Sequence, residues 1–376
     1  MNEAKESGLL GLNLEDLRTL VEREGQPNYR AKQLFEGLYQ QRVASLDDIS
    51  TLPQQFRRVL RDRGLQVGLP TVEKKFASRD GTIRYLIRFS DGESVETVWM
   101  PEGDEGESGD GTEVGDELEK GTARSWDRAT ICVSSQVGCA VDCQFCMTAL
   151  LGVKRNLTAG EIVGQIAVVL RNQKVSPPEQ RVNLVFMGMG EPFLNYDNFM
   201  RAVRLLVDGM GIPESRMTVS TAGVEPRIAD FGREPVRPKL AISLNAPNDE
   251  LRTKLMPINR KWNLEKLMAA ARDFPLRPRE KLTFEYVLLA GVNDSSTHAR
   301  EVVELLRGLR AKINLIALNP GPGIDFGTPA EERVLEFQKI LRAAGTPAFI
   351  RRPRGRDIYA ACGQLKRTKE IPEASH

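Results

Sequence analysis

Three cysteines stand close together at positions 139, 143 and 146, in the stretch GCAVDCQFCMTA. This C-x3-C-x2-C spacing places three thiols on one tight loop, and three thiolates can hold three irons of a 4Fe–4S cluster. The fourth iron is then left without a protein ligand and can bind a substrate-like cofactor. The spacing therefore predicts chemistry at the cluster rather than electron relay alone.

Other uses of these cysteines fit the sequence less well. A structural zinc site requires four protein ligands, usually from two knuckles, and the chain offers no second C-x2-C knuckle. A disulfide framework is typical of small secreted proteins, whereas this chain has 376 residues, five cysteines and no secretory signal. Inert cysteines in a hydrophobic core are the remaining alternative.

The composition is that of a soluble globular protein, with 41% apolar and 28% charged residues. The length allows a full catalytic core and one accessory domain. No apolar run approaches the roughly 18 residues that span a bilayer. We therefore expect a cytoplasmic protein in a reducing compartment, where exposed thiols and an iron–sulfur cluster persist.

The net charge of +2 conceals an uneven distribution of charged residues. Residues 102–120 hold nine of the 51 acidic residues and one of the 53 basic ones, which leaves a net charge of +10 on the rest of the chain. We expect residues 102–126, rich in glycine and acid, to form a flexible insertion. The basic remainder is compatible with a polyanionic partner.

Two small units precede the insertion. Residues 1–66 contain three helical patterns, and the eight Lys and Arg residues between 23 and 63 indicate either a solvated surface or an RNA-binding accessory domain. Residues 67–101 form a β extension in which alternating segments are separated by Asp-Gly turns at 80–81 and 91–92.

From residue 127 to 350 the sequence alternates between strand and helix patterns, which predicts an α/β fold with a partial (βα)6 barrel. The expected strands are ATICVSS, VNLVFMGMG, RMTVSTAG, KLAISLNA, LTFEYVLLAG and KINLIALNP. The expected helices lie near 158–172, 196–208, 263–273, 296–310 and 329–343. The cysteine loop follows the first strand, at the end of the barrel where such enzymes place their chemistry.

Polar and glycine-rich loops follow four of these strands, and each alone is a weak signal because Gly and Pro simply make turns. They are GMGEP (188–192), STAG (220–223), SLNAPND (243–249) and NPGPG (319–323). Together they surround one mouth of the barrel. An amino-acid-like sulfonium cofactor needs a carboxylate near its ammonium group, which Glu191 can supply.

The cysteine motif and GMGEP resemble those of the radical S-adenosylmethionine (SAM) enzymes. The longer string from ATICVSSQVGC to LTAGEIVGQI, with VSTAGV, ISLNAPND and LNPGPG, resembles one family, the RlmN-type adenine-C2 methyltransferases. The resemblance extends from about Asn28 to Cys362. It implies methylation of C2 of adenosine at position 2503 of 23S rRNA and position 37 of tRNA.

The resemblance also assigns roles to two further cysteines. C2 of adenine is a poor nucleophile, so ordinary methyl transfer from SAM should fail there. The resemblance implies that Cys362, in YAACGQL, carries the methyl group as S-methylcysteine, which a 5′-deoxyadenosyl radical then activates. It implies that Cys132 releases the product through a transient disulfide with Cys362, and that Glu96 accepts the C2 proton.

The resemblance carries over a set of cofactor contacts and partners. Cys139, Cys143 and Cys146 would bind one 4Fe–4S cluster, and two SAM molecules would be used per turnover. The expected SAM contacts are Gly190, Glu191, Ser220, Ser243, Leu244, Asn245 and Asn319. The implied partners are 23S rRNA, tRNA and a flavodoxin- or ferredoxin-type electron donor. The basic segment 351–376, which carries Cys362, would contact RNA phosphates.

Three other functions remain open at this point. An adenosine C8 methyltransferase of the antibiotic-resistance type has the same cysteine chemistry, and no residue here excludes it. A glycyl-radical activase would need the cluster but neither Cys132 nor Cys362. A non-catalytic RNA-binding iron–sulfur module would bind RNA without consuming SAM.

Overall fold

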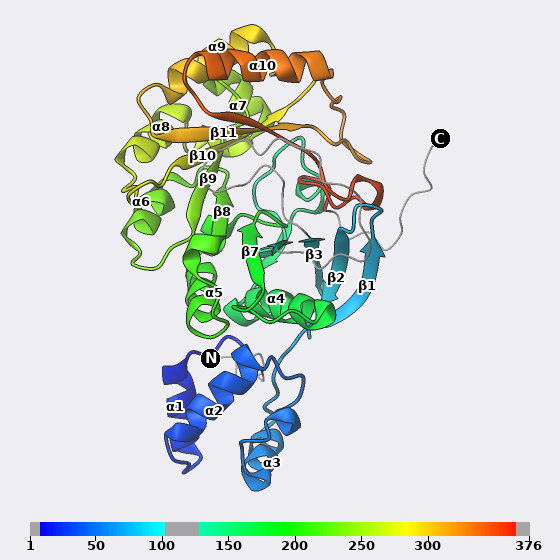
Figure 1. The fold of residues 1–376 in the computed structure, drawn as a ribbon, viewed down its shortest axis with the longest axis vertical. Coiled ribbons are helices and arrows are strands. Elements are labelled where there is room, and N and C mark those ends of the chain that lie inside the picture. Colours follow the sequence, from blue (N-terminus) through cyan, green and yellow to red (C-terminus); the bar gives the residue numbers. More distant parts are fainter. Residues whose placement is uncertain (1–7, 102–127, 366–376) are drawn as a thin grey trace.

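A computed structural model describes residues 8–101 and 128–365 (Figure 1). The predicted acidic insertion, 102–126, lies outside the described residues, as do the last residues of the basic segment from 366 onward. Over the described ranges, the structure has no helix that is both long and apolar enough to cross a membrane.

Three short helices form the N-terminal part of the chain, as the sequence predicts. They are α1 (Leu14–Arg23), α2 (Tyr29–Phe35) and α3 (Gln54–Asp62). The first helix begins at a capping box, in which Asn13 and Asp16 each accept a hydrogen bond from the other's backbone N–H. Figure 1 shows this group beyond α4, at the edge of the main body. Gly11 packs there against Gly160, where a Cβ on Gly160 would lie 2.0 Å from the Leu10 carbonyl oxygen.

A ten-stranded sheet forms the main body, in the order β1-β2-β3-β4-β7-β8-β9-β10-β11-β12. The first strands, which pair antiparallel, are β1 (Thr71–Ala77), β2 (Ile83–Arg88), β3 (Ser94–Pro101) and β4 (Arg128–Cys132). The remaining strands run parallel to β4 and are β7 (Arg181–Phe186), β8 (Met217–Thr221), β9 (Lys239–Ser243), β10 (Leu282–Leu288), β11 (Ala311–Ala317) and β12 (Ala348–Arg351). The β extension and the barrel therefore share one continuous sheet.

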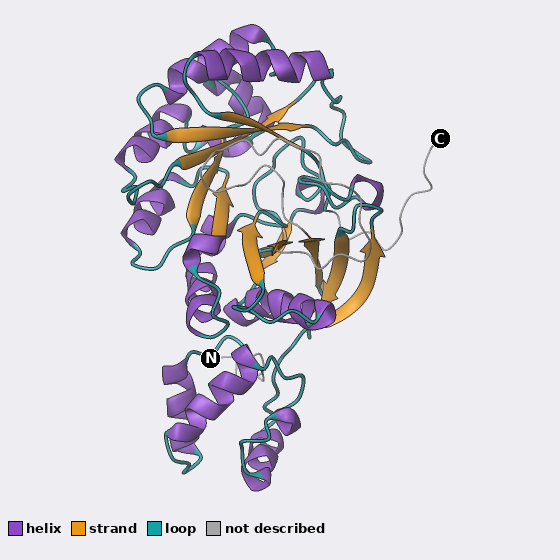
Figure 2. Cartoon of the chain, in the orientation of Figure 1, coloured by secondary structure: helices purple, strands orange, loops and turns teal. Residues whose placement is uncertain are grey.

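Helices cover the outer face of the parallel strands (Figure 2). The predicted helices are present as α4 (Ala159–Gln173), α5 (Tyr196–Asp208), α8 (Leu264–Asp273), α9 (Ser296–Leu306) and α10 (Glu331–Ala343). Together with the six predicted strands, they confirm the α/β barrel fold. The sequence patterns do not predict α6 (Glu225–Arg233), α7 (Asp249–Leu255) or strand β12, all of which are short.

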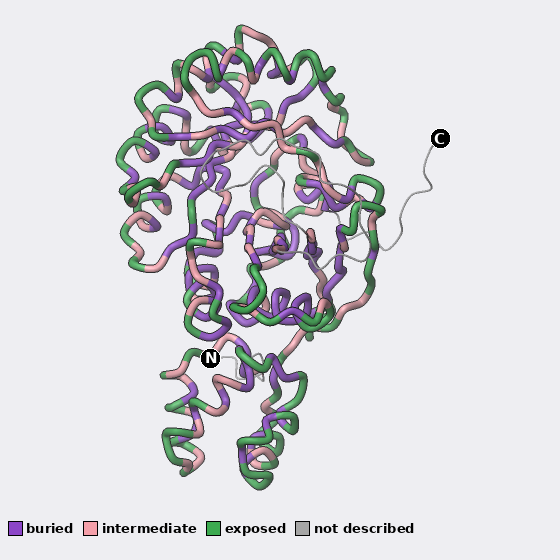
Figure 3. The backbone as a smooth tube through the Cα atoms, in the orientation of Figure 1, coloured by how far each residue is buried: buried purple, intermediate pink, exposed green. Residues whose placement is uncertain are grey.

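Buried residues are concentrated in the strands of the sheet and in the helices that cover it (Figure 3). One continuous apolar core joins the N-terminal helices, the sheet and the outer helices. A second, smaller apolar cluster lies at the carboxyl ends of the strands and includes Val141, Phe145, Ala222, Leu255 and Met256. The three closely spaced cysteines pack against this second cluster.

Candidate active site

The loop with the three cysteines is closed at its base by a small antiparallel hairpin. Strand β5 (Gln136–Gly138) enters the loop and β6 (Val153–Asn156) leaves it. Gly138 has a φ of +82°, and a Cβ there would lie 1.8 Å from the carbonyl oxygen of Gly152. Only glycine allows this close approach of the two backbones. The loop therefore begins and ends at one fixed point.

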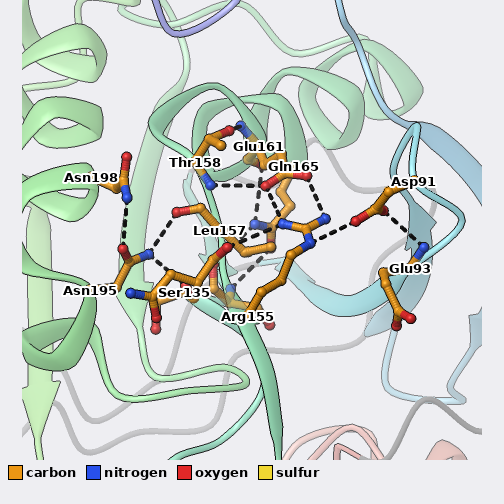
Figure 4. A network of polar contacts seen from close by, with 12 residues as sticks. Asp91, Glu93, Ser135, Arg155, Leu157, Thr158, Glu161, Gln165, Asn195 and Asn198 are labelled. Atoms are coloured by element: carbon orange, nitrogen blue, oxygen red, sulfur yellow. Dashed lines mark hydrogen bonds and ion pairs between the residues drawn. The ribbon is translucent and has the colours of Figure 1, made fainter. Parts of the chain in front are cut away.

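Arg155 on β6 anchors this hairpin to two neighbouring elements (Figure 4). Its guanidinium makes two hydrogen bonds to Glu161 at the start of α4, at 2.7 and 2.8 Å. It also donates to Asp91, in the turn between β2 and β3, at 2.7 Å. Paired bonds between arginine and carboxylate fix orientation as well as distance. The cysteine loop is thus held against both the β extension and the barrel.

The same close-up shows Asn195 bridging two backbone segments (Figure 4). Its side-chain amide donates to the carbonyl of Ser135, at 2.9 Å, and to that of Leu157, at 2.7 Å. These two residues flank the β5–β6 hairpin on either side. Asn195 therefore fixes both ends of the segment that presents the cysteines.

Burial strongly affects the thiols of this loop. It raises the pKa of Cys139 to about 12, with a contribution from the Cys146 thiol, and it raises the pKa of Cys143 well above its usual range. A bound cation reverses this preference, because a coordinating thiol is deprotonated outright. Among the described residues, no three His, Cys, Asp or Glu side chains are arranged to hold one metal ion. Three thiols on one short loop are also the donor set by which a 4Fe–4S cluster is held, and each would face a different iron.

A cavity of about 160 Å³ opens beside the cysteine loop at the carboxyl ends of the strands. Most of the candidate site residues predicted from the sequence line this cavity, although they come from distant parts of the chain. Those that line it are Cys139, Cys143, Cys146, Gly190, Glu191, Ser220, Ser243, Asn245, Asn319 and Cys362. Three of the selected residues, Glu96, Cys132 and Leu244, are not in its lining.

Glu191 is a buried carboxylate in the wall of this cavity, with 3% of its surface exposed. Its Oε1 accepts a hydrogen bond from the backbone N–H of Phe193 at 2.9 Å, and its Oε2 accepts one from that of Ala222 at 2.6 Å. Burial raises the pKa of Glu191 to about 7, although these hydrogen bonds oppose the shift. The carboxylate is oriented by the backbone and positioned to receive a cationic group.

Hydroxyl and carboxylate groups from three adjacent strands meet in another wall. The Oγ of Ser220 on β8 donates to Glu285 on β10 at 2.9 Å, and it lies 3.2 Å from the Oγ of Ser243 on β9. Glu285 lines the cavity but was not selected from the sequence. Leu244 is fully buried, and its backbone N–H donates to the Glu285 carbonyl at 2.9 Å. The Leu244 carbonyl accepts from Arg252 at 3.1 Å, so both backbone groups of Leu244 are already paired within the protein.

The two selected asparagines line the cavity with amides that bind the protein itself. Asn245 has a φ of +56°, and its Oδ1 accepts from the backbone N–H of Val287 at 2.9 Å. Its Nδ2 lies 3.2 Å from the sulfur of Met256. Asn319 follows β11, and its amide is 3.4 Å from the carbonyl of Ala317.

Cys362 is exposed, and it faces the same cavity as the cysteine loop. Its segment is tied to that loop by the backbone N–H of Met147, which donates to Gly363 at 2.7 Å, and by the Thr148 hydroxyl, which donates to Leu365 at 2.7 Å. Further upstream, the Asp357 carboxylate accepts a hydrogen bond at 2.6 Å from the hydroxyl of Ser78, which lies in the β1–β2 turn. Figure 1 shows the last described residues, in red, beside β1 and β2.

Cys132 ends strand β4 and is 8% exposed. Burial raises the pKa of its thiol far above the usual range, and the neighbouring Cys362 and Glu285 add to the shift. The structure therefore brings Cys132 and Cys362 into electrostatic contact although 230 positions separate them in sequence.

Glu96 lies on β3, away from the cavity lining. Its side chain is fully buried and forms an ion pair with Arg84 on β2, which is equally buried. The Ser134 hydroxyl donates to the Glu96 carbonyl at 2.6 Å, so the backbone of Glu96 is fixed next to the strand that precedes the cysteine loop. Its role as a proton acceptor stays a prediction.

Comparison with known proteins agrees with this geometry. Residues 133–306 match the family model described as the radical SAM superfamily, and residues 7–64 match that of the ribosomal RNA large subunit methyltransferase N-terminal domain. A probable dual-specificity RNA methyltransferase RlmN of Koribacter versatilis is 66% identical, over 93% of this chain and 99% of the relative. The RlmN of Syntrophobacter fumaroxidans is 44% identical, over 94% and 96%.

Among solved structures, a radical SAM methyltransferase from Sphaerobacter thermophilus matches with a TM-score of 0.85. It is 43% identical in sequence, and the match covers 96% of this chain and 99% of that one. The similarity thus spans the N-terminal helices, the β extension and the barrel together. The chain belongs to the RlmN family of dual-specificity RNA methyltransferases, within the radical SAM superfamily.

Proposed function

We propose that this enzyme methylates C2 of adenosine in both 23S rRNA and tRNA, with the methyl group carried on Cys362. The observation that carries the proposal is one cavity that is lined by Cys139, Cys143, Cys146 and Cys362 together. A cluster alone generates a radical, whereas a thiol facing the cluster provides a place to hold the methyl group that the radical activates.

The family uses a 4Fe–4S cluster and SAM. Cys139, Cys143 and Cys146 would hold the cluster, and two SAM molecules would be used in each turnover. When bound, these groups supply a methyl group and, after one-electron reduction by a flavodoxin- or ferredoxin-type donor, a 5′-deoxyadenosyl radical. Glu191 holds the ammonium group of SAM through its buried carboxylate. The other SAM contacts are Gly190, Ser220, Ser243, Leu244, Asn245 and Asn319.

Cys362 acts first as a nucleophile. As a thiolate it attacks the sulfonium methyl group, and the new S–CH3 bond replaces the bond to the departing sulfur. Its exposed position lets the same sulfur face the cofactor and then the RNA base. The hydrogen bonds from Met147 and Thr148 keep it close to the cysteine loop during both steps.

Cys132 then separates the product from the protein. Its sulfur, as the thiolate, attacks that of Cys362 in the thioether that joins Cys362 to the RNA, and the S–S bond of a transient disulfide replaces the S–C bond. The electron pair of the broken bond stays on the methylene carbon, which takes up a proton and becomes the methyl group at C2. The raised pKa of Cys132 keeps this thiol protonated until a base takes its proton. This protects it from premature reaction with SAM, since the thiol form is a weak nucleophile.

Glu96 is proposed to accept the C2 proton of adenosine. Its ion pair with the equally buried Arg84 fixes the carboxylate in place. Because the carboxylate is fully buried, the RNA base must reach it through a local opening near β3. Exchange of the RNA C2 deuterium into solvent, lost in Glu96→Gln while Cys362 is still methylated, would support this role.

RNA is held by basic surfaces outside the cavity. Arg351, Arg352, Arg354 and Arg356 precede Cys362, and Arg57, Arg58 and Arg61 lie on α3. Cations at such positions contact phosphates and set the register of the strand without recognising bases. The target adenosine then leaves its stack and enters the cavity mouth.

The direct test is nucleoside mass spectrometry of a 23S rRNA fragment and a tRNA after incubation with the reconstituted enzyme, SAM and reductant. We expect 2-methyladenosine in both RNAs. Methylation at C8 would show the resistance-type activity instead, and consumption of SAM without RNA methylation would refute both.

A further inference from the structure

Arg252 on α7 is a fully buried arginine that contacts the segments at the ends of β8 and β9. Its Nη2 donates to the carbonyls of Ala222, at 2.8 Å, and Ser243, at 3.1 Å. Its Nε donates to the backbone carbonyl of Leu244 at 3.1 Å, and its Nη1 donates to the side-chain Oδ1 of Asn259 at 2.8 Å. One guanidinium therefore joins the ends of β8, β9 and α7.

All four acceptors are neutral oxygens. Among residues 8–101 and 128–365, no carboxylate oxygen lies within 4.0 Å of the Arg252 guanidinium. The nearby carboxylate of Asp249 is already used, because it accepts from the Asn259 amide and from the Leu264 N–H, both at 2.8 Å. Burial lowers the pKa of Arg252 to about 10, so the group still carries its charge at neutral pH.

This charge lies against the loop that holds the cluster cysteines. The backbone N–H of Gln144, inside the C-x2-C stretch, donates to the carbonyl of Leu255 on the same helix at 2.9 Å. Leu255 and Ala222 belong to the apolar cluster against which the three cysteines pack. Arg252 and Cys143 also perturb each other electrostatically, each stabilising the charged form of the other.

We propose that Arg252 is a positioning residue whose fixed positive charge raises the reduction potential of the cluster. The proposal rests on the three-cysteine ligation stated above. Reduction adds one electron from the external donor to the cluster and neither forms nor breaks a bond to the protein. A nearby buried cation stabilises the added negative charge, because the surrounding dielectric is low and water is excluded.

The neutral oxygens around Arg252 make this effect larger than for an ordinary buried arginine. A contacting carboxylate would cancel most of its field at the cluster. Arg237 provides the contrast: it is 2% exposed but makes two bonds to Glu280, at 2.8 and 2.9 Å. Arg252 therefore acts as an uncompensated charge, whereas Arg237 acts as half of an ion pair.

The test is a redox titration of the reconstituted holoenzyme, followed by the electron paramagnetic resonance signal of the reduced cluster. Arg252→Gln removes the charge and keeps hydrogen-bond donors, whereas Arg252→Lys keeps the charge and loses most of the bonds. We expect the potential to fall in Arg252→Gln and to stay near the wild-type value in Arg252→Lys. Arg237→Gln should lower thermal stability without moving the potential.

A second pair of substitutions covers the case in which Arg252→Gln takes up no iron. Asp249→Asn combined with Asn259→Asp moves a carboxylate onto the Arg252 Nη1 without changing the net charge or removing Arg252. We expect a smaller fall of the potential in this double variant. The proposal would be overturned if the reduction potential were unchanged in Arg252→Gln or, where that variant holds no cluster, in the double variant.

The underlying ligation is checked separately, by the iron content of Cys143→Ala. If that variant held an unaltered cluster, the three-cysteine assignment would be wrong, whatever the result at Arg252. Suppose instead that Cys143→Ala loses the cluster and that the reduction potential is the same with and without the Arg252 charge. These results would refute only the inference about Arg252.

Discussion

The backbone N–H of Met147 donates to the carbonyl of Gly363 at 2.7 Å, so the residue after the last loop cysteine is bonded to the residue after Cys362. Two segments more than 200 positions apart are thereby joined beside both functional sulfurs. The arrangement couples the position of Cys362, the proposed methyl carrier, to that of the cysteine loop. It also indicates which side chains should control methyl loading.

Thr148→Val should reduce methylation of Cys362 and leave the iron content unchanged. The substitution removes the buried hydroxyl that donates to Leu365, a bond worth about 1 kcal/mol, and leaves the carbonyl without that partner. Intact-protein mass spectrometry after incubation with SAM measures the methylated fraction. Thr19→Val, at an exposed bond within α1, is the matched control and should load normally.

Cys132→Ala should accumulate a covalent adduct between the protein and RNA. Methyl loading and addition to the base depend on Cys362, whereas release depends on the attack by Cys132. Denaturing gels with labelled RNA detect the adduct, and Cys132→Ala/Cys362→Ala should form none. Full turnover by Cys132→Ala without an adduct would contradict both assignments.

Gly138→Ala should abolish cluster incorporation, because its Cβ would meet the Gly152 carbonyl oxygen at 1.8 Å. Gly152→Ala is the natural comparison. Gly152 also has a positive φ, +60°, but a Cβ there meets nothing within 4 Å, so that variant should lose about 1–3 kcal/mol of stability through backbone strain alone. Iron analysis and thermal unfolding separate the two cases. Equal loss of iron in both would argue against the close crossing at the loop base.

Acid should loosen the segment before Cys362 through Asp80. Burial alone would raise the pKa of Asp80, but hydrogen bonds from the N–H groups of Gly355 and Thr82 outweigh it and lower the pKa. The stabilisation is therefore present above the unfolded pKa near 3.8 and is lost as pH falls through the lower folded value.

Hydrogen exchange at the Gly355 amide measures this effect. Protection should fall below about pH 4 in the wild type, from the pKa window just described. Asp80→Asn should show weaker protection that no longer varies over that range. A wild-type amide whose protection is constant down to pH 2 would exclude the contact.

The sequence predicted the parts of this molecule that depend on strong local patterns. The six strands and five helices of the barrel have clear periodicity, and the loops after the strands meet because parallel strands end at one edge. Helix α7 has seven residues, fewer than two full turns, and β12 has only four, so neither shows a repeating pattern. The sequence did not indicate Arg252, because its contacts are tertiary and no local pattern marks them.

Side-chain placement was harder to foresee than backbone placement. Glu96 belongs to a strand that is buried on both faces in its central part, so alternation does not show which way its carboxylate is used. Glu285 comes from a strand with apolar neighbours, and only the structure places it beside Ser220. Cys362 was selected through the resemblance, because no spacing connects it to the cysteine loop.

The segment that carries Cys362 is tied down on both sides, to the β1–β2 turn before it and to the cysteine loop after it. These attachments restrict the movement of the Cys362 sulfur to what the few residues between them allow. If Cys362 carries the methyl group, the adenosine must therefore come to the sulfur, which favours a base that can leave its stack.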